Sequence, residues 1–174
     1  MGYMKNNIKK LCNFYVSDWH LVTMLIPYIN NQLNQGVKIT TILENDIQEN
    51  VVTLVKKLNL KNEQEILKID WQTKSIGKFE ELQEKLRVRT EEEIIIVLNG
   101  SMNYINRVNE MLEKNAKQHP NKTFKIINCF EVSDFNCNIN EILETHDKIL
   151  NTSGEKDIEE VFEGYQNTEI KKAN

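Results

Sequence analysis

The sequence predicts an α/β fold in three layers, with a mainly parallel five-stranded sheet between two layers of helices. Short apolar runs alternate along the chain with longer stretches whose apolar residues recur every three or four positions. Two of the runs, IIIVL (residues 94–98) and FKIIN (124–128), look like strands that are largely buried. A helix between two strands of one sheet forms a crossover connection, which is right-handed and leaves the two strands parallel. Because strand and helix alternate along this chain, we expect a mainly parallel sheet.

The apolar runs predict strands at residues 11–16, 37–43, 66–69, 93–98 and 123–130. The helix after the first strand has an apolar face made by Trp19, Val22, Ile26, Ile29 and Leu33. Gly36 suits the C-terminal cap of this helix, and Pro27 should kink it or shift its start. The later helices are predicted from four apolar faces: Ile47, Val51, Val55 and Leu58; Phe79, Leu82 and Leu86; Ile105, Val108 and Leu112; and Ile139, Ile142, Leu143, Ile149 and Leu150.

The chain has 174 residues, which suits a single domain with its own core. We expect this domain to cover residues 1–150 and to be followed, in residues 151–174, by a linker and an acidic amphipathic helix. The spacing i, i+3, i+4, i+7 predicts the helix over 156–166. It is shorter than the roughly 12 to 15 residues at which isolated helices become marginal, so it must dock on its own domain, on a partner or on a second copy of the chain. Its candidate contact residues are Ile158, Val161, Phe162 and Tyr165.

Composition restricts the partners. The formal net charge is -4, with 22 Lys and Arg against 26 Asp and Glu, so nothing resembles the basic surface that nucleic-acid binding needs. No apolar run approaches the roughly 20 residues of a membrane span, and the N-terminus lacks the features of a signal peptide. The three cysteines have no metal-like spacing and suit a reducing compartment. We therefore expect a cytoplasmic protein without nucleic-acid or membrane partners.

Motifs for nucleotide or catalytic chemistry are missing from the sequence. The turn after the first strand, residues 16–20, has no glycine or lysine with which to hold a phosphate. The only Gly-Lys pair, Gly77-Lys78, has Gln72 where the first glycine of a phosphate loop belongs. Neither GxSxG nor HExxH occurs, and there are only three histidines. We expect no catalytic residues, no cofactor and no bound metal.

Polar residues do follow each predicted strand, and parallel strands bring such residues to one edge, where open α/β sheets bind ligands. The candidate ligand-binding residues there are Ser17, Asp18, Glu44, Asp70, Trp71, Asn99, Ser101 and Glu131. The alternative is that these residues cap helices and form loops, since Ser17, Asp18 and Ser101 are ordinary N-cap types, and Trp71 can equally pack in the core.

His146 is a further ligand candidate, although its place on the apolar stripe of a predicted helix also suits a buried core histidine. Cys12 and Cys129 lie on predicted strands, where buried, unreactive thiols are expected.

Several stretches resemble the MEDS sensory domain, a signalling module of methanogens and methylotrophs. LCNFYVSDWHLVTMLIPYINNQLNQGVKITTIL (residues 11–43) resembles the opening of that domain, and IDWQTKSIGKFEELQEKL (69–86) and IIIVLNGSMNYINRVNEML (94–112) resemble its later strand, turn and helix segments. FKIINCFEVSDFNCNINEILETHDKIL (124–150) resembles its closing strand with a Cys, an aromatic and an acid, followed by a Thr-His pair. The likeness covers about residues 8–150.

The resemblance implies a degenerate RecA- or KaiC-like domain without a working nucleotide loop, acting as a sensor or interaction module. Cys129, Phe130 and Glu131 match the family's Cys-aromatic-acid neighbourhood, Gly100 and Met102 its Gly-x-Met turn, and Thr145 and His146 its Thr-His pair. The chain departs from the family at Leu11, Ser101 and Asp147, so its ligand is expected to differ if those positions line the site.

The leading hypothesis is a stand-alone, non-catalytic sensory or regulatory module of bacterial signal transduction. It would bind a small ligand or a signalling protein, such as a histidine kinase or a transcription regulator, and act in trans by protein contact. One alternative is a small enzyme that uses Asp70 or Glu44 as a general base. Another is an interaction domain like an anti-sigma-factor antagonist.

Overall fold

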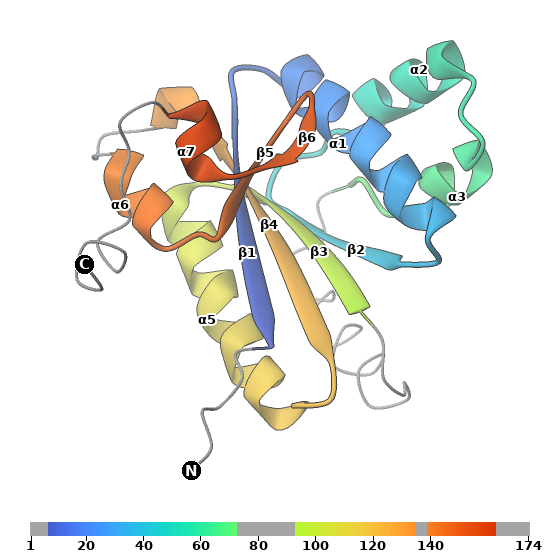
Figure 1. Cartoon of the computed structure of the whole chain (residues 1–174). Helices are drawn as coiled ribbons and strands as arrows, with labels where there is room; N and C mark the ends of the chain where they lie inside the picture. Colours follow the sequence, from blue (N-terminus) through green and yellow to red (C-terminus); the bar gives the residue numbers. More distant parts are fainter. Residues whose placement is uncertain (1–6, 73–92, 135–138, 163–174) are drawn as a thin grey trace.

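The computed structural model describes residues 7–72, 93–134 and 139–162. These residues form an α/β fold with a six-stranded, mostly parallel sheet in the order β2-β3-β4-β1-β5-β6 (Figure 1). Only β6 is antiparallel to its neighbour. The strands are β1 (Ile8–Tyr15), β2 (Lys38–Leu43), β3 (Glu93–Gly100), β4 (Thr123–Glu131), β5 (Lys148–Asn151) and β6 (Gly154–Lys156).

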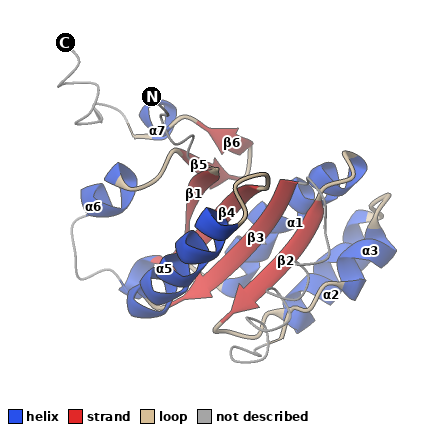
Figure 2. Cartoon of the chain, turned by 90° about the horizontal axis from the view of Figure 1, so that it is seen from below, coloured by secondary structure: helices blue, strands red, loops and turns tan. Residues whose placement is uncertain are grey.

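Helices cover both faces of this sheet, which is why the central strands are apolar on both sides (Figure 2). One face carries α1 (Asp18–Asn34), α2 (Gln48–Leu58) and α3 (Glu63–Lys68), packed on side chains such as Leu11, Ile95 and Ile127. On the opposite face α5 (Met102–Gln118) packs against Ile96 and Ile126. The remaining elements are η1 (Val132–Asp134), α6 (Ile139–Glu144) and α7 (Ile158–Val161).

The expected strands at 11–16, 37–43, 93–98 and 123–130 are confirmed as β1 to β4, with ends shifted by a few residues. The expected strand at 66–69 is wrong, because residues 63–68 form helix α3. Ile66 is its only fully buried residue, while the flanking Glu65 and Lys68 are exposed and form an i,i+3 ion pair. A four-residue apolar run cannot by itself separate a strand from one face of a short helix.

The sheet has six strands rather than five, because residues 148–156 form the β5–β6 hairpin. The predicted helix over 139–150 ends at Glu144, and Ile149 and Leu150 lie in β5 beside β1. The segment expected to be a linker supplies β6. Gly154 makes the reversal possible, since its φ of +98° lies in a region that residues with a Cβ rarely adopt.

The predicted helices around 19–33, 47–58 and 105–112 are confirmed as α1, α2 and α5. Gly36 lies just past α1 with φ +77°, as expected of a C-terminal cap, and Pro27 is an exposed residue within α1, which begins at Asp18. The predicted helix at Phe79, Leu82 and Leu86 lies outside the described residues.

The predicted tail helix is present in part, as the four residues of α7. Ile158 is buried and the partly buried Phe162 packs with it, in a cluster that includes Ile142 and Ile149. Val161 remains 39% exposed. The predicted start at residue 156 is wrong, because Lys156 belongs to β6 and the helix begins at Ile158. Tyr165 and the other residues of the predicted helix beyond 162 lie outside the described residues. The described part of the tail therefore docks on its own domain. No helix in the part of the chain that the structure describes is long and apolar enough to cross a bilayer.

A buried ionic cluster joins the β5–β6 hairpin to the centre of the sheet. The carboxylate of Glu155 on β6 lies 2.8 Å from Nζ of Lys125 on β4, accepts a hydrogen bond of 2.7 Å from the Tyr28 hydroxyl on α1, and lies 3.1 Å from Nζ of Lys9. Burial alone would raise the pKa of Glu155, but the hydrogen bonds from Lys125 and Tyr28 and the charge of Lys125 outweigh it and lower that pKa to about 2.

We predict that Glu155→Ala reduces the free energy of unfolding by about 2 kcal/mol, because the buried ammonium of Lys125 loses its nearer carboxylate and keeps that of Glu93, 3.7 Å from Nζ. Glu159→Ala removes an exposed carboxylate from α7 and is the matched control, with an expected loss below about 0.5 kcal/mol. Urea denaturation of the full chain measures both. Since the folded pKa is lowered, the contribution of Glu155 is fully present above pH 4.5 and is lost as pH falls towards 2. Equal losses in the two variants would contradict the stabilising role of the cluster.

Candidate functional site

Parallel pairing brings the carboxyl ends of β1 to β4 to one edge of the sheet. Asn99 is in register with Leu43 on one side and Cys129 on the other, and Tyr15 is in register with Glu131. Five predicted ligand residues therefore reach this edge from four neighbouring strands or the turns that follow them: Ser17, Asp18, Glu44, Ser101 and Glu131. Asn99 lies just before the edge, as the penultimate residue of β3, and is completely buried.

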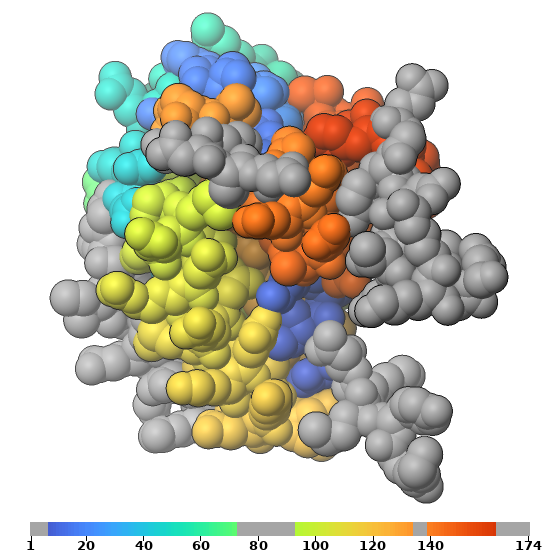
Figure 3. Space-filling model, turned by 90° about the vertical axis from the view of Figure 1, so that its left-hand side faces the viewer, coloured from blue at the N-terminus to red at the C-terminus, as the bar shows by residue number. Residues whose placement is uncertain are grey.

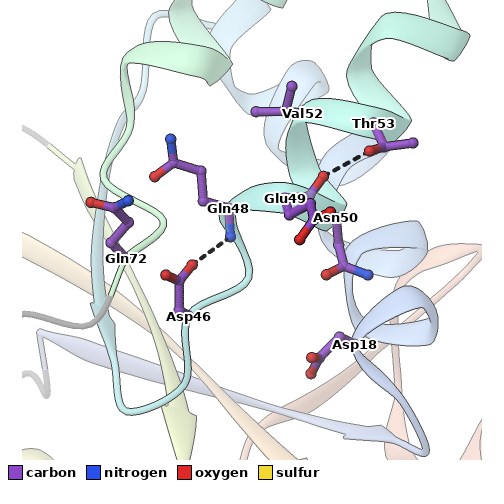
Figure 4. A pocket seen from close by; sticks show the side chains of 8 residues that line it. All are labelled: Asp18, Asp46, Gln48, Glu49, Asn50, Val52, Thr53 and Gln72. Carbon is purple, nitrogen blue, oxygen red and sulfur yellow. Dashed lines mark hydrogen bonds between the residues drawn. The ribbon is translucent and has the colours of Figure 1, made fainter.

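A pocket of about 660 Å³ opens at this edge, between the start of α1 and the start of α2 (Figure 4). Figure 4 shows Asp18, Asp46 and Gln72 coming from three different segments around the hollow. Asp18 is the one predicted ligand residue in its wall. The full lining consists of Asp18, Asp46, Gln48, Glu49, Asn50, Val52, Thr53 and Gln72.

The lining determines which ligands the pocket suits. It contains three carboxylates, three side-chain amides and one hydroxyl, and no Lys, Arg or His among its described residues. Asp46 lies two residues before α2 begins, and its carboxylate accepts a hydrogen bond of 2.9 Å from the backbone N–H of Gln48, the first residue of that helix. The carboxylates favour a cationic or neutral polar ligand and oppose a phosphate, because like charges repel across a small cavity.

In the turn between β1 and α1, backbone N–H groups donate to side chains of the same turn. The Ser17 hydroxyl accepts a hydrogen bond of 3.1 Å from the N–H of His20, and the backbone N–H of Val16 donates to Nδ1 of His20 at 3.0 Å. A phosphate site at a helix N-terminus needs such N–H groups to point at the ligand. In this turn the N–H groups of Val16 and His20 already donate to side chains of the same turn. The turn also lacks glycine, so it does not suit a phosphate.

Glu44 joins the loop after β2 to the start of α5. Its carboxylate accepts a hydrogen bond of 2.9 Å from the backbone N–H of Ser101, and the Ser101 hydroxyl caps α5 by accepting from the N–H of Tyr104. Gly100 is required at this point, since a Cβ there would lie 2.8 Å from Cβ of Glu44 and 2.7 Å from the Tyr104 ring. The N-terminus of α5 is thus occupied by a carboxylate of the chain itself.

Asn99 also holds the loop that follows β2 in place. Its Oδ1 accepts hydrogen bonds from the backbone N–H groups of Glu44 at 3.1 Å and Asn45 at 3.4 Å. Its Nδ2 is buried without a hydrogen-bond partner among the described residues. Asn99 and Glu44 therefore position the loop that carries Asp46 into the pocket wall.

Asp70 and Trp71 do not line the pocket. Trp71 is 1% exposed, its indole N–H donates to the carbonyl of Ile66 at 2.9 Å, and its own carbonyl accepts from Ile47. The Asp70 carboxylate accepts from the backbone N–H of Gln72 at 3.0 Å. These two residues are part of the framework that places Gln72 in the wall.

His146 lies away from this edge, in a buried polar network on the α5 side of the sheet. Its Nδ1 is 2.6 Å from the carbonyl oxygen of Ile142, so Nδ1 carries the hydrogen and Nε2 accepts from Nδ2 of Asn128 at 2.9 Å. Asn128 and Asn109 in turn pair through their side-chain amides, and the imidazole meets the Phe130 ring edge-on. This arrangement requires a neutral imidazole and suits a core histidine.

Cys12 and Cys129 are buried free thiols. Burial raises the pKa of Cys12 to about 12 and also raises the pKa of Cys129. Neither thiol is available as a thiolate near neutral pH, in agreement with packing roles. The described residues include no group of three or more His, Cys, Asp or Glu side chains that could hold a metal ion.

Sequence reasoning missed most of the pocket wall, because seven of its eight lining residues lie outside the predicted set: Asp46, Gln48, Glu49, Asn50, Val52, Thr53 and Gln72. An aspartate shortly before a helix, such as Asp46, is a recognisable signal that a helix begins. It marks the start of α2, but it does not indicate which residues of α2 line a pocket.

Comparison of the chain with models of protein families, with curated proteins and with solved structures gave no match.

Substitution of Trp71 and of Trp19 tests whether Trp71 supports the wall of the pocket. We predict that Trp71→Ala lowers the free energy of unfolding by about 3 to 5 kcal/mol, because it empties a buried site and removes a hydrogen bond. Trp19→Ala is the matched control, since Trp19 is 46% exposed, and should cost about 0.5 kcal/mol or less. Chemical denaturation of both variants measures the difference. A small effect of Trp71→Ala would show that the indole does not support the pocket wall.

The second prediction from the site concerns pH. Burial lowers the pKa of His146 to about 4, helped by the charge of Lys10 and opposed by the hydrogen bond to Ile142. Because the unfolded chain takes up a proton near pH 6.5 and the folded chain does not, stability should fall by about 3 kcal/mol as pH drops from 7 to 4. His146→Asn should be less stable at pH 7 and should lack this part of the pH dependence. Denaturation curves at several pH values test it, and an unchanged slope in the variant would contradict it.

Proposed function

We propose that this chain is a non-catalytic regulatory module of bacterial signal transduction that binds a small cationic or neutral polar ligand. The ligand would occupy the pocket between α1 and α2, and its presence would be passed on through contact with another protein. The observation that carries this proposal is the pocket itself. It lies at the carboxyl edge of a parallel sheet and is lined by carboxylates, amides and a hydroxyl.

The finer description of the fold is part of the same proposal. We infer a RecA- or KaiC-like domain without a nucleotide loop, as the resemblance to MEDS domains implies. Two observations support it: β1 lies inside a parallel sheet, and the turn that follows has its backbone donors bound within the chain. The carboxylate of Glu44 at the start of α5 adds a further obstacle to a phosphate at this edge.

A regulatory module also needs a connection between its ligand and its outer surfaces, and the Glu44 contact supplies one. The loop that carries Asp46 into the pocket is bonded through Glu44 to Ser101 at the start of α5. Helix α5 lies on the opposite face of the sheet (Figure 2). A ligand that moves this loop would therefore act on both faces.

The alternative of a small enzyme receives less support. Both candidate general bases hold backbone groups in place: Glu44 accepts from the N–H of Ser101, and Asp70 accepts from the N–H of Gln72. Such contacts favour a structural role for the two carboxylates over a role as general base.

Ligand titration of the full chain tests the proposal. The probes are putrescine, arginine and betaine as cationic or zwitterionic ligands, with inorganic phosphate and magnesium-ATP as anionic ones. We expect at least one of the first three to raise the melting temperature, because a ligand that binds only the folded state stabilises it. Glu49→Gln should weaken that binding at least tenfold, and Glu110→Gln, an equal change on α5, should not.

Three results would overturn the proposal: stabilisation by phosphate or ATP alone, equal weakening by the two substitutions, or binding of none of the cationic or zwitterionic probes at millimolar concentration.

A further inference from the structure

Three exposed apolar side chains gather at the carboxyl edge of the sheet, beside the pocket. Val16 is 67% exposed, Trp19 46% and Val132 42%. Val16 and Val132 directly follow Tyr15 and Glu131, which are register partners, so the two valines leave neighbouring strands at the same level of the sheet. Trp19 is in the first turn of α1, three residues after Val16. We refer to these three residues as the edge patch.

The space-filling view agrees with this placement. Figure 3 shows the start of α1, in blue, next to residues 132–134, in orange, at the top of the molecule. Apolar side chains that stay in water at one spot are typical of interaction surfaces, and tryptophan is the residue most often found at the centre of a binding hot spot.

Among the described residues, the charged side chains in the segments that carry the edge patch and in the adjoining pocket wall are acidic. Asp18 lies between Val16 and Trp19 in the chain, Glu131 precedes Val132, and Asp46 and Glu49 line the adjoining pocket. The described segments that leave the carboxyl ends of β1 to β4, residues 16–17, 44–47, 101 and 132–134, contain no Lys or Arg. The potential at this edge is therefore negative and selects a positively charged partner.

We propose that the edge patch is the docking surface for a basic segment of a partner protein. Apolar side chains of that segment would pack on Trp19, Val16 and Val132, and its Lys or Arg side chains would pair with Asp18 and Glu131. The proposal rests on the proposed function, in which a protein contact passes on the state of the pocket, and it specifies the chemistry of that partner.

The same charges disfavour the two other occupants. An anionic membrane surface would repel the carboxylates. A second copy of this chain, docked symmetrically, would bring an identical set of carboxylates against them. A basic protein segment gains from both features of the surface, the apolar contact and the charge.

Three synthetic 14-residue peptides provide the probe. The first is amphipathic, with four leucines on one face and six lysines on the other; the second has glutamate in place of each lysine; the third is a scrambled form of the first. Fluorescence anisotropy of the labelled peptides is measured with the full chain at physiological salt. We expect the basic amphipathic peptide to bind at least tenfold more tightly than the scrambled one, and the acidic peptide not to bind.

Paired substitutions locate the contact. The double variant Val16→Ser, Val132→Ser should weaken binding at least tenfold, as should Asp18→Asn combined with Glu131→Gln. The matched control is Leu58→Ser, Met111→Ser, which removes two exposed apolar side chains from α2 and α5 and should leave affinity within twofold. Circular dichroism and melting temperature check that each variant is folded.

The outcomes separate this proposal from the proposed function. Equal affinity for the three peptides, no binding at 1 mM, or equal losses in the edge-patch and control variants overturns the docking surface. Sedimentation that shows a dimer, dissociated by the edge-patch substitutions, overturns it in favour of a second copy. Binding of putrescine, arginine or betaine in the pocket is measured without peptide and is lost in Glu49→Gln, so either proposal can fail while the other stands.

Discussion

The fold depends on the parallel pairing of β1 with β4 over the whole length of β1. This pairing places the first strand inside the sheet, between β4 and β5, so that both of its faces must be covered. It accounts for buried side chains on opposite faces of the same strand, such as Leu11 towards α1 and Cys12 towards α6. It also aligns the ends of four strands, which creates the edge where the pocket and the edge patch lie side by side.

Much of this architecture could be predicted because the central strands have both faces buried. The continuous apolar run at 94–98 indicates β3, and the apolar residues over 123–130 indicate β4, although Lys125 and Asn128 interrupt them. Prediction failed where the deciding interaction is distant in the sequence. Nothing near Glu155 indicates a strand, since its partners Lys125 and Tyr28 lie far away along the chain. Ile66 in α3 and Ile149 in β5 show the same difficulty, because a short apolar run fits either element until its neighbour is known.

The sequence predicts ligand residues at the edge of the sheet where the pocket opens, and Asp18 is the one of them that lines it. Residues that follow strands converge by geometry, so Asp18, Glu44, Ser101 and Glu131 could be anticipated. Which of them face a hollow depends on side-chain packing. Glu44 turned out to be bonded to Ser101, and Trp71 lies in the core. Glu49 and Thr53 line the wall because of the way α2 packs beside α1, a relation between two helices that neither sequence segment contains.

The position of β1 also has a consequence for how the chain acquires its structure. Ile8 pairs with Phe124 and Leu11 with Lys148, so the first strand has neither neighbour until more than half of the polypeptide has been synthesised. Contacts of such long sequence separation form slowly, because a large loop must close before they contribute. During that interval both hydrogen-bonding edges of an apolar strand are open to other chains. Helix α1, which follows β1 immediately and packs on Leu11, is the local element able to cover one face of the strand in the meantime.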